Sequence, residues 1–293
     1  MTTTVSAILE ISCLAKGPAG EGEDALAIAI ADGAVRFAGV VDGVTDKSGR
    51  SYGTDSGGRL AAKRVAAALC ALAADATADQ AVSAATIAVA ELRDVFGVPD
   101  GDPTPPAAGF AILSVQRREI WRVGDANVAW TSGLEWVQRE GETLLDKAAA
   151  TVRAVYLTAL LEQGADPTKL TATDPGREVI LPMLQMQGML ANRDAADPLG
   201  YGVIDGTQVP PRHIEVFALP DAACEVVMVT DGYLSAAPTL QAAEAELRLS
   251  LVADPLRIKA HRATKAVRPG AESFDDRSYV RVQLTARPRE GLS

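Results

Sequence analysis

Short apolar and alternating runs open the chain, in residues 5–12 and 25–41. Apolar positions that alternate with polar ones are typical of strands with one buried face. Asp32-Gly33 lies between two of these runs, and Asp-Gly is a preferred sequence for the two-residue turn of a β-hairpin. The pattern therefore predicts an antiparallel meander at the start of the chain.

Clusters of predicted helices and clusters of predicted strands then follow one another. Helical composition and periodicity indicate helices at 59–73, about 78–95, 143–162, 177–191, 238–251 and 255–267. Alternating or continuous apolar runs indicate strands at 108–115, 119–131, 213–219, 225–230 and 279–285. Segregated clusters favour an α+β fold, in which antiparallel sheets carry helices on their outer faces, over a doubly wound parallel fold.

The Pro-rich stretch 103–106 is the best candidate for a domain boundary. Predicted strands lie on both sides of it and need each other to complete a sheet, so we interpret it as a loop. We expect residues 1–293 to form a single domain.

Charge and cysteine content narrow the class of partner and the compartment. The net charge is -10, and without a concentrated basic face the chain is poorly suited to bind nucleic acid. Cys13, Cys70 and Cys224 lie in apolar surroundings without CxxC spacing, which predicts buried, reduced thiols. The N-terminus has no basic region and meets Glu10 early, so we expect a cytoplasmic protein without a signal peptide or membrane helix.

Acidic residues recur where predicted strands begin or end. The four places are Glu23-Asp24, Asp42-Gly43, Asp231-Gly232 and Asp275-Asp276. Each alone is a common turn or cap sequence. Together they predict carboxylates that meet at one end of a sheet, and such oxygen ligands without histidine or cysteine suit Mg²⁺ or Mn²⁺.

The order of these motifs resembles the metal-dependent serine/threonine protein phosphatases of the type 2C class, as a divergent member of bacterial type. The resemblance runs from about residue 5 to 285 and implies a four-layer α-β-β-α sandwich of two antiparallel sheets. The motifs that carry it are Gly22-Glu-Asp-Ala25, Val41-Asp-Gly43, Val123-Gly-Asp-Ala126, Thr230-Asp-Gly232 and Asp275-Asp-Arg-Ser-Tyr-Val280.

The resemblance implies a site for two divalent metal ions, Mn²⁺ or Mg²⁺. Asp42 would bridge them; Asp231 and Asp275 would complete one shell, and Glu23 with the Gly43 carbonyl would help to hold the other. Asp24 would support this shell, and Asp194 or Asp197 would contact a third ion. Two such ions activate water at neutral pH and neutralise charge on a phosphoryl group, so phosphoserine or phosphothreonine hydrolysis needs no protein nucleophile.

The chain also departs from the family pattern, which puts the choice of substrate in question. The arginine that the family uses to grip the substrate phosphate is missing before Glu23, and the segment from Val44 to Gly58 is different. The candidates to replace that arginine are Lys16, Lys47, Arg50 and Arg59. The resemblance implies a phosphorylated protein or a small phosphate ester as the substrate. The alternative is a catalytically silent module that binds a phosphorylated partner or a nucleotide.

Several polar and sulfur-containing residues have simpler structural interpretations. Asp125 is expected to fix a hairpin turn. His213 and His261 are expected at the surface or in caps, the second in a basic helix. The three methionines at helical spacing are expected in the core: Met183, Met186 and Met189.

Overall fold

Two five-stranded antiparallel sheets stack face to face in the computed structural model, which describes residues 6–17, 22–194 and 198–287. One sheet has the order β2 (Ala25–Ala31), β3 (Ala34–Gly43), β4 (Ala108–Ser114), β5 (Glu119–Val123) and β8 (Glu215–Ala218). The other has the order β1 (Ser6–Leu14), β10 (Arg277–Leu284), β9 (Cys224–Val229), β6 (Asn127–Ser132) and β7 (Glu135–Arg139).

The opening hairpin has the geometry that its sequence predicts. Asp32 and Gly33 have φ angles of 51° and 75°, the left-handed region that both central residues of a type I′ turn require. Through this turn β2 pairs with β3, and Ala25 lies opposite Val41. The meander at the start of the sheet is confirmed.

The space between the sheets is filled by β-branched and other apolar side chains from alternate strand positions. On β4, Ala111 and Leu113 face the other sheet, whereas Phe110 and Ile112 face the helices. Every residue of this strand is buried. A strand that is covered on both faces has a nearly continuous run of apolar residues in its sequence, and β4 has such a run.

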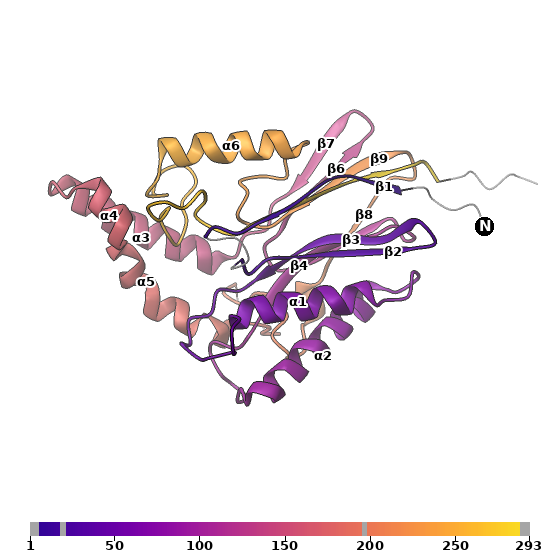
Figure 1. Ribbon diagram of the computed structural model, residues 1–293, viewed down its shortest axis with the longest axis horizontal. Coiled ribbons are helices and arrows are strands. Elements are labelled where there is room, and N and C mark those ends of the chain that lie inside the picture. Colours follow the sequence, from indigo (N-terminus) through magenta and orange to yellow (C-terminus); the bar gives the residue numbers. More distant parts are fainter. Residues whose placement is uncertain (1–5, 18–21, 195–197, 288–293) are drawn as a thin grey trace, which may run out of the picture.

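Helices cover the outer face of each sheet and complete four layers (Figure 1). Alanines of α1 (Gly57–Cys70) and α2 (Ala78–Phe96), among them Ala61 and Ala85, pack without exposure against the sheet that contains β3. On the opposite face, Leu247 of α6 (Leu240–Ala253) packs with the cluster that contains Val227. The predicted α+β sandwich is therefore confirmed.

Three further helices lie at one end of the sandwich (Figure 1): α3 (Leu144–Glu162), α4 (Pro167–Thr173) and α5 (Pro175–Met186). Short 3₁₀ turns, η1 (Gln187–Leu190) and η2 (Pro211–His213), follow. The sequence pattern did not predict α4 or β7. The exposed methionines correct the expected core stripe, because α5 buries Ile180 and Leu184 and leaves Met183 and Met186 exposed, and Met189 of η1 is exposed as well.

The helix predicted at 255–267 is wrong, since this segment consists of turns and bends. Arg257 has a φ of 54°, which an α-helix does not allow. The fully buried Arg153 of α3 donates hydrogen bonds to the carbonyls of Leu256 and Ala263, at 2.9 and 3.0 Å. These carbonyls are thereby satisfied without helical bonds. His261 consequently lies exposed on an irregular segment.

All three cysteines are free, but only Cys224 is fully buried, whereas Cys13 is exposed. The prediction of unpaired thiols holds and the prediction of uniform burial is wrong. Within the described part of the chain, none of the helices has both the length and the apolar character that a bilayer crossing requires.

Candidate functional site

Strand ends from both sheets bring Asp42, Asp231 and Asp275 to one cleft of about 130 Å³, whereas Glu23, Asp24 and Asp276 do not line it. Asp42 ends β3 in one sheet, and Asp231 and Asp275 flank β9 and β10 in the other. Pairing of β9 with β10 continues to Thr230, whose backbone N–H donates to the carbonyl of Ser278 at 3.1 Å. Antiparallel register therefore puts the residue after β9 beside the residues before β10.

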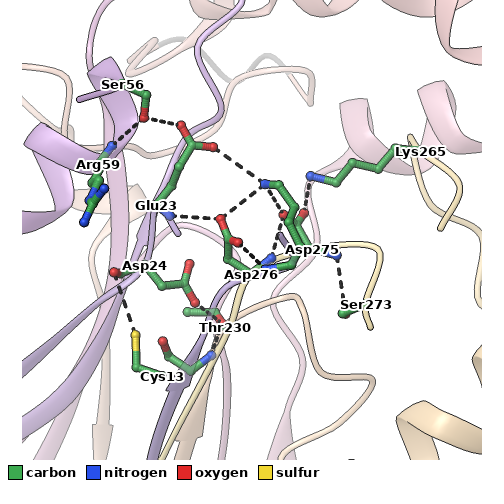
Figure 2. Close-up of polar contacts among 12 residues, drawn as sticks. Cys13, Glu23, Asp24, Ser56, Arg59, Thr230, Lys265, Ser273, Asp275 and Asp276 are labelled. Atoms are coloured by element: carbon green, nitrogen blue, oxygen red, sulfur yellow. Dashed lines mark hydrogen bonds and ion pairs between the residues drawn. The ribbon is translucent and has the colours of Figure 1, made fainter. Parts of the chain in front are cut away.

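Asp276, which is almost fully buried, fixes the approach of the segment that carries Glu23. Its carboxylate accepts hydrogen bonds from the backbone N–H groups of Lys16 at 2.7 Å and Glu23 at 2.9 Å. The Glu23 carboxylate in turn accepts a hydrogen bond from the Ser56 hydroxyl at 2.6 Å, next to the start of α1. Figure 2 shows Glu23, Asp275 and Asp276 gathered around one point.

Gly43 is required by close packing in this structure. A Cβ atom at this position would lie 2.5 Å from the carbonyl oxygen of Glu23 and 2.6 Å from that of Gly58. Both distances are far below van der Waals contact. The glycine therefore lets β3, the Glu23 segment and the first turn of α1 meet next to Asp42.

Asp24 lies behind the cleft and accepts a hydrogen bond from the Thr230 hydroxyl at 2.8 Å (Figure 2). Burial is the largest influence on this carboxyl group, and the Asp275 and Asp276 charges act in the same direction. They outweigh the hydrogen bonds and raise the pKa of Asp24 to about 7.

Asp42 and Asp231 have carboxylates that repel one another. Burial, followed by the charges of Asp231 and Asp24, raises the pKa of Asp42 well above its usual value. Desolvation in the cleft, followed by the charges of Asp275 and Asp125, raises the pKa of Asp231 in the same way, although part of this residue is open to solvent. Carboxylates in such an arrangement favour a bound cation.

Asp275 behaves differently because two lysines surround it. Burial opposes its ionisation, but the Lys265 and Lys16 ammonium groups outweigh burial and lower the pKa of Asp275. The Nζ atom of Lys265 lies 2.5 Å from one carboxylate oxygen, and that of Lys16 lies 3.1 Å from the other. Asp275 is therefore paired with two cations, unlike Asp42 and Asp231, for which the described residues show no ion pair.

Three basic side chains line the same cleft: Lys47, Arg177 and Lys265. Burial, then the charges of Arg177 and Lys265, lowers the pKa of Lys47 to about 8. One guanidinium nitrogen of Arg177 donates to the carbonyl of Thr264 at 3.1 Å, which fixes the side chain of this α5 residue. Convergent cations beside carboxylates provide a place for an anion as well as for a metal ion.

Of the four basic residues that the sequence suggested for phosphate binding, only Lys47 lines this cleft. Arg50 pairs with Asp102 and donates to the Tyr52 hydroxyl at 3.2 Å. Arg59 pairs with Asp55 at 3.3 Å, and its guanidinium points away from the acidic cluster (Figure 2). Lys47 lines the cleft, and Lys16 lies among the carboxylates.

Four residues that the sequence analysis did not assign to a site line the cleft: Asp125, Asp146, Arg177 and Lys265. Asp125 follows Gly124, whose φ is 100°, so it occupies the expected turn, but the turn lies in the cleft. Burial, then the Asp146 charge, raises the pKa of Asp125 to about 6. The Val-Gly-Asp-Ala motif was the available signal for Asp125, whereas no local pattern marks the other three.

Only one of the two residues proposed to contact a third ion is described by the structure. Asp194 is exposed and does not line the cleft, and Asp197 lies outside the described residues. His213 is half-buried at the end of η2, and its ring lies 3.2 Å from the carbonyl of Arg193. Neither histidine lines the 130 Å³ cleft. His261, however, lines a second cavity of about 600 Å³ that Asp231 and Asp275 also line, so it lies nearer to the acidic residues than the sequence led us to expect.

The carboxylates of Asp42 and Asp231 fit a hard divalent cation, because such ions prefer oxygen ligands. Within the described residues, neither carboxylate forms an ion pair with a lysine or arginine, and each raises the pKa of other acidic groups in the cleft or has its own raised by them. Across residues 6–17, 22–194 and 198–287, no three acidic, histidine or cysteine side chains converge tightly enough to hold a metal ion on their own. Asp42 and Asp231 thus supply carboxylate oxygens in the cleft without forming a closed metal site there, and Lys265 lines the same cleft.

No known sequence family and no curated protein matches this chain. Solved structures do match it. The catalytic domain of the serine/threonine phosphatase PstP in complex with two manganese ions is 16% identical, with a TM-score of 0.51 over 97% of this chain and 100% of that one. PstP/Ppp from Mycobacterium tuberculosis is 17% identical, with a TM-score of 0.48 over 96% and 99% of the two chains. Stp1 from Staphylococcus aureus is 11% identical, with a TM-score of 0.48 over 98% and 99%. The chain therefore has the fold of the type 2C class of serine/threonine phosphatases, as its motifs led us to expect.

Proposed function

We propose that this protein is a metal-dependent phosphatase that hydrolyses phosphate monoesters, with phosphoserine or phosphothreonine of a protein as the substrate and a small phosphate ester as the alternative. The observation that supports it most is the cleft in which Asp42 and Asp231, from different sheets, lie with Lys47 and Arg177. Carboxylates for a cation and basic groups for an anion are what hydrolysis of a phosphate ester requires.

Asp42 and Asp231 would hold Mn²⁺ or Mg²⁺, with Asp275 and the Gly43 carbonyl as further candidate ligands and Glu23 and Asp24 in support. A divalent cation there would supply Lewis-acid polarisation of a phosphoryl oxygen and activation of a water molecule at neutral pH. The resemblance implies two ions.

Lys47 and Arg177 would bind and orient the phosphate in place of the missing family arginine. Their mutual repulsion, which contributes to the lowered pKa of Lys47, is relieved when an anion lies between them. The neutral fraction of Lys47 grows above pH 8, so phosphate binding is expected to weaken there. Thr264, which anchors Arg177 through its carbonyl, would fix the direction of the guanidinium.

The enzyme proposal is tested by hydrolysis of an aryl phosphate and of a phosphothreonine peptide by pure protein, with Mn²⁺, with Mg²⁺ and with a chelator. Metal-dependent turnover that Asp42→Asn abolishes is the expected result. Asp94→Asn, on the exposed side of α2, is the matched control and should behave as the parent. Turnover that the chelator or Asp42→Asn leaves unchanged contradicts the proposal.

A catalytically silent module that binds a phosphorylated partner or a nucleotide is the second candidate. It is favoured by Lys16 and Lys265, because they neutralise Asp275 without a metal ion. If neither substrate is turned over with either metal, while a phosphothreonine peptide still binds and Arg177→Gln weakens its binding, the silent module is the function.

A further inference from the structure

An ammonium group already lies on the Glu23 side of the acidic cluster. The Nζ atom of Lys16 is 3.1 Å from Asp275, 3.2 Å from Asp276 and 3.8 Å from Glu23, measured to the carboxylate oxygens. Three carboxylates at these distances stabilise the charged form of the ammonium group. The group is therefore a permanent cation at physiological pH.

The position of Lys16 is fixed at both ends of the residue. Its backbone N–H donates to Asp276 at 2.7 Å, and its ammonium group donates to Asp275 and to the other oxygen of Asp276. Asp276 also accepts a hydrogen bond from the backbone of Glu23. The lysine is thus held by the same side chain that positions Glu23, which is unlike a flexible surface lysine.

A second ammonium group completes the arrangement on Asp275. Lys265 contacts one oxygen of this carboxylate and Lys16 the other, as the distances of 2.5 and 3.1 Å show (Figure 2 shows the Lys265 contact). Two positive charges face Asp275, while the described residues give Asp42 and Asp231 no ion pair. Among the described residues, the cluster therefore has cations paired with its carboxylates at one end and carboxylates without a paired cation at the other.

We propose that Lys16 and Lys265 are built-in cations that take the place of one divalent ion, so that the chain would bind a single divalent cation, in the part of the cleft that Asp42 and Asp231 line. This inference rests on the proposed function and specifies the site that it uses. A doubly charged ion at Glu23 and Asp275 would have to lie within a few ångströms of two ammonium groups, and like charges at that distance repel strongly at the low effective dielectric of a protein.

The proposal is tested by calorimetric titration of Mn²⁺ into metal-free protein, with the bound metal counted by elemental analysis. The variants are Lys16→Met, which keeps the apolar stem without the charge, and Lys63→Met, which removes the ammonium that pairs with Asp55 on the outer side of the site. Wild type and Lys63→Met should bind one ion per chain. Lys16→Met should bind a second ion, or bind the first about tenfold more tightly.

The proposal is overturned if wild type binds two ions of similar affinity, or if Lys16→Met changes neither the number nor the affinity. Lys16→Met that unfolds without metal and folds with Mn²⁺ supports it, because the ion then takes over the role of the ammonium. If Lys16→Met folds under neither condition, Lys265→Met decides. About threefold tighter Mn²⁺ binding by that variant supports the proposal, and unchanged affinity overturns it.

Metal counting separates this inference from the proposed function, since it needs no turnover. A protein that binds one ion and hydrolyses no phosphate ester leaves the inference intact and refutes the enzyme. A protein that binds two ions and hydrolyses phosphate esters refutes the inference and supports the proposed function.

Discussion

Asp24→Asn should stabilise the metal-free protein, and more so at alkaline than at acidic pH. The variant removes the charge and retains an oxygen that can accept the hydrogen bond from Thr230. The pKa of Asp24 is raised from 3.8 to about 7, and 1.36 kcal/mol per pKa unit makes this ~4 kcal/mol for an isolated group. Because part of the residue is open to solvent, the effect is reduced, and we expect about 2 kcal/mol.

The sign follows from proton binding. An unfolded chain loses the Asp24 proton near pH 4, whereas the folded chain keeps it up to about pH 7. Between these values the folded state holds more protons, so the free energy of unfolding of the parent falls as the pH rises. The asparagine variant lacks this contribution. Its advantage should therefore be small at pH 4.5 and complete at pH 8.

The assay is urea unfolding in chelator, followed by far-UV circular dichroism, at pH 4.5 and pH 8. Asp94→Asn controls for removal of an exposed negative charge and should shift the free energy of unfolding by less than about 0.5 kcal/mol at both values. A variant that is destabilised at pH 8, or stabilised equally at the two pH values, refutes the electrostatic argument.

Three further predictions concern phosphate binding and packing. In a steady-state pH profile, the KM of the parent for an aryl phosphate should rise above pH 8, whereas the KM of Lys47→Gln should be high at every pH. A parallel rise of KM in both proteins contradicts the role of Lys47. Arg153→Met should cost about 3–5 kcal/mol in urea unfolding, because it strands the Asp174 charge and the carbonyls of residues 256 and 263, whereas the exposed Arg268→Met should cost little. Gly43→Ala should cost at least about 1–3 kcal/mol in the same assay, since its Cβ has no room, and an unchanged midpoint would show that the backbone yields.

The strand ends were predictable from the sequence because each is marked locally. An apolar run followed by Asp-Gly identifies the end of β3 and the end of β9 without knowledge of the fold. The hairpin at Asp32-Gly33 is equally local, since the turn itself demands positive φ. Order along the chain, together with the family resemblance, then brought Asp42, Asp231 and Asp275 together correctly in one cleft.

The failures arise where a distant residue decides the local structure. Residues 255–267 have helical periodicity, but Arg153, about a hundred positions earlier, binds their carbonyls and prevents a helix. Met183 and Met186 of α5 also have the spacing of one helix face. Periodicity does not show which of two apolar faces packs against the rest of the protein, and here it is the face that carries Ile180 and Leu184.

Charge in the site was the hardest feature to predict. Arg50 and Arg59 are close in sequence to Asp42 but are paired with Asp102 and Asp55, whereas Lys265 and Arg177 reach the cleft from segments far along the chain. No periodicity or motif marks these two residues, because their role depends on how α5 and the irregular segment after α6 pack at the end of the sandwich.

The position of the cleft at the ends of both sheets has a mechanical consequence. Asp42 belongs to one sheet and Asp231 follows a strand of the other, so a ligand held by both residues links the two sheets. Separation of the sheets then requires release of the ligand. Ligand binding should therefore slow unfolding as well as shift its midpoint, and would make the lifetime of the folded chain depend on the concentration of the ion around it.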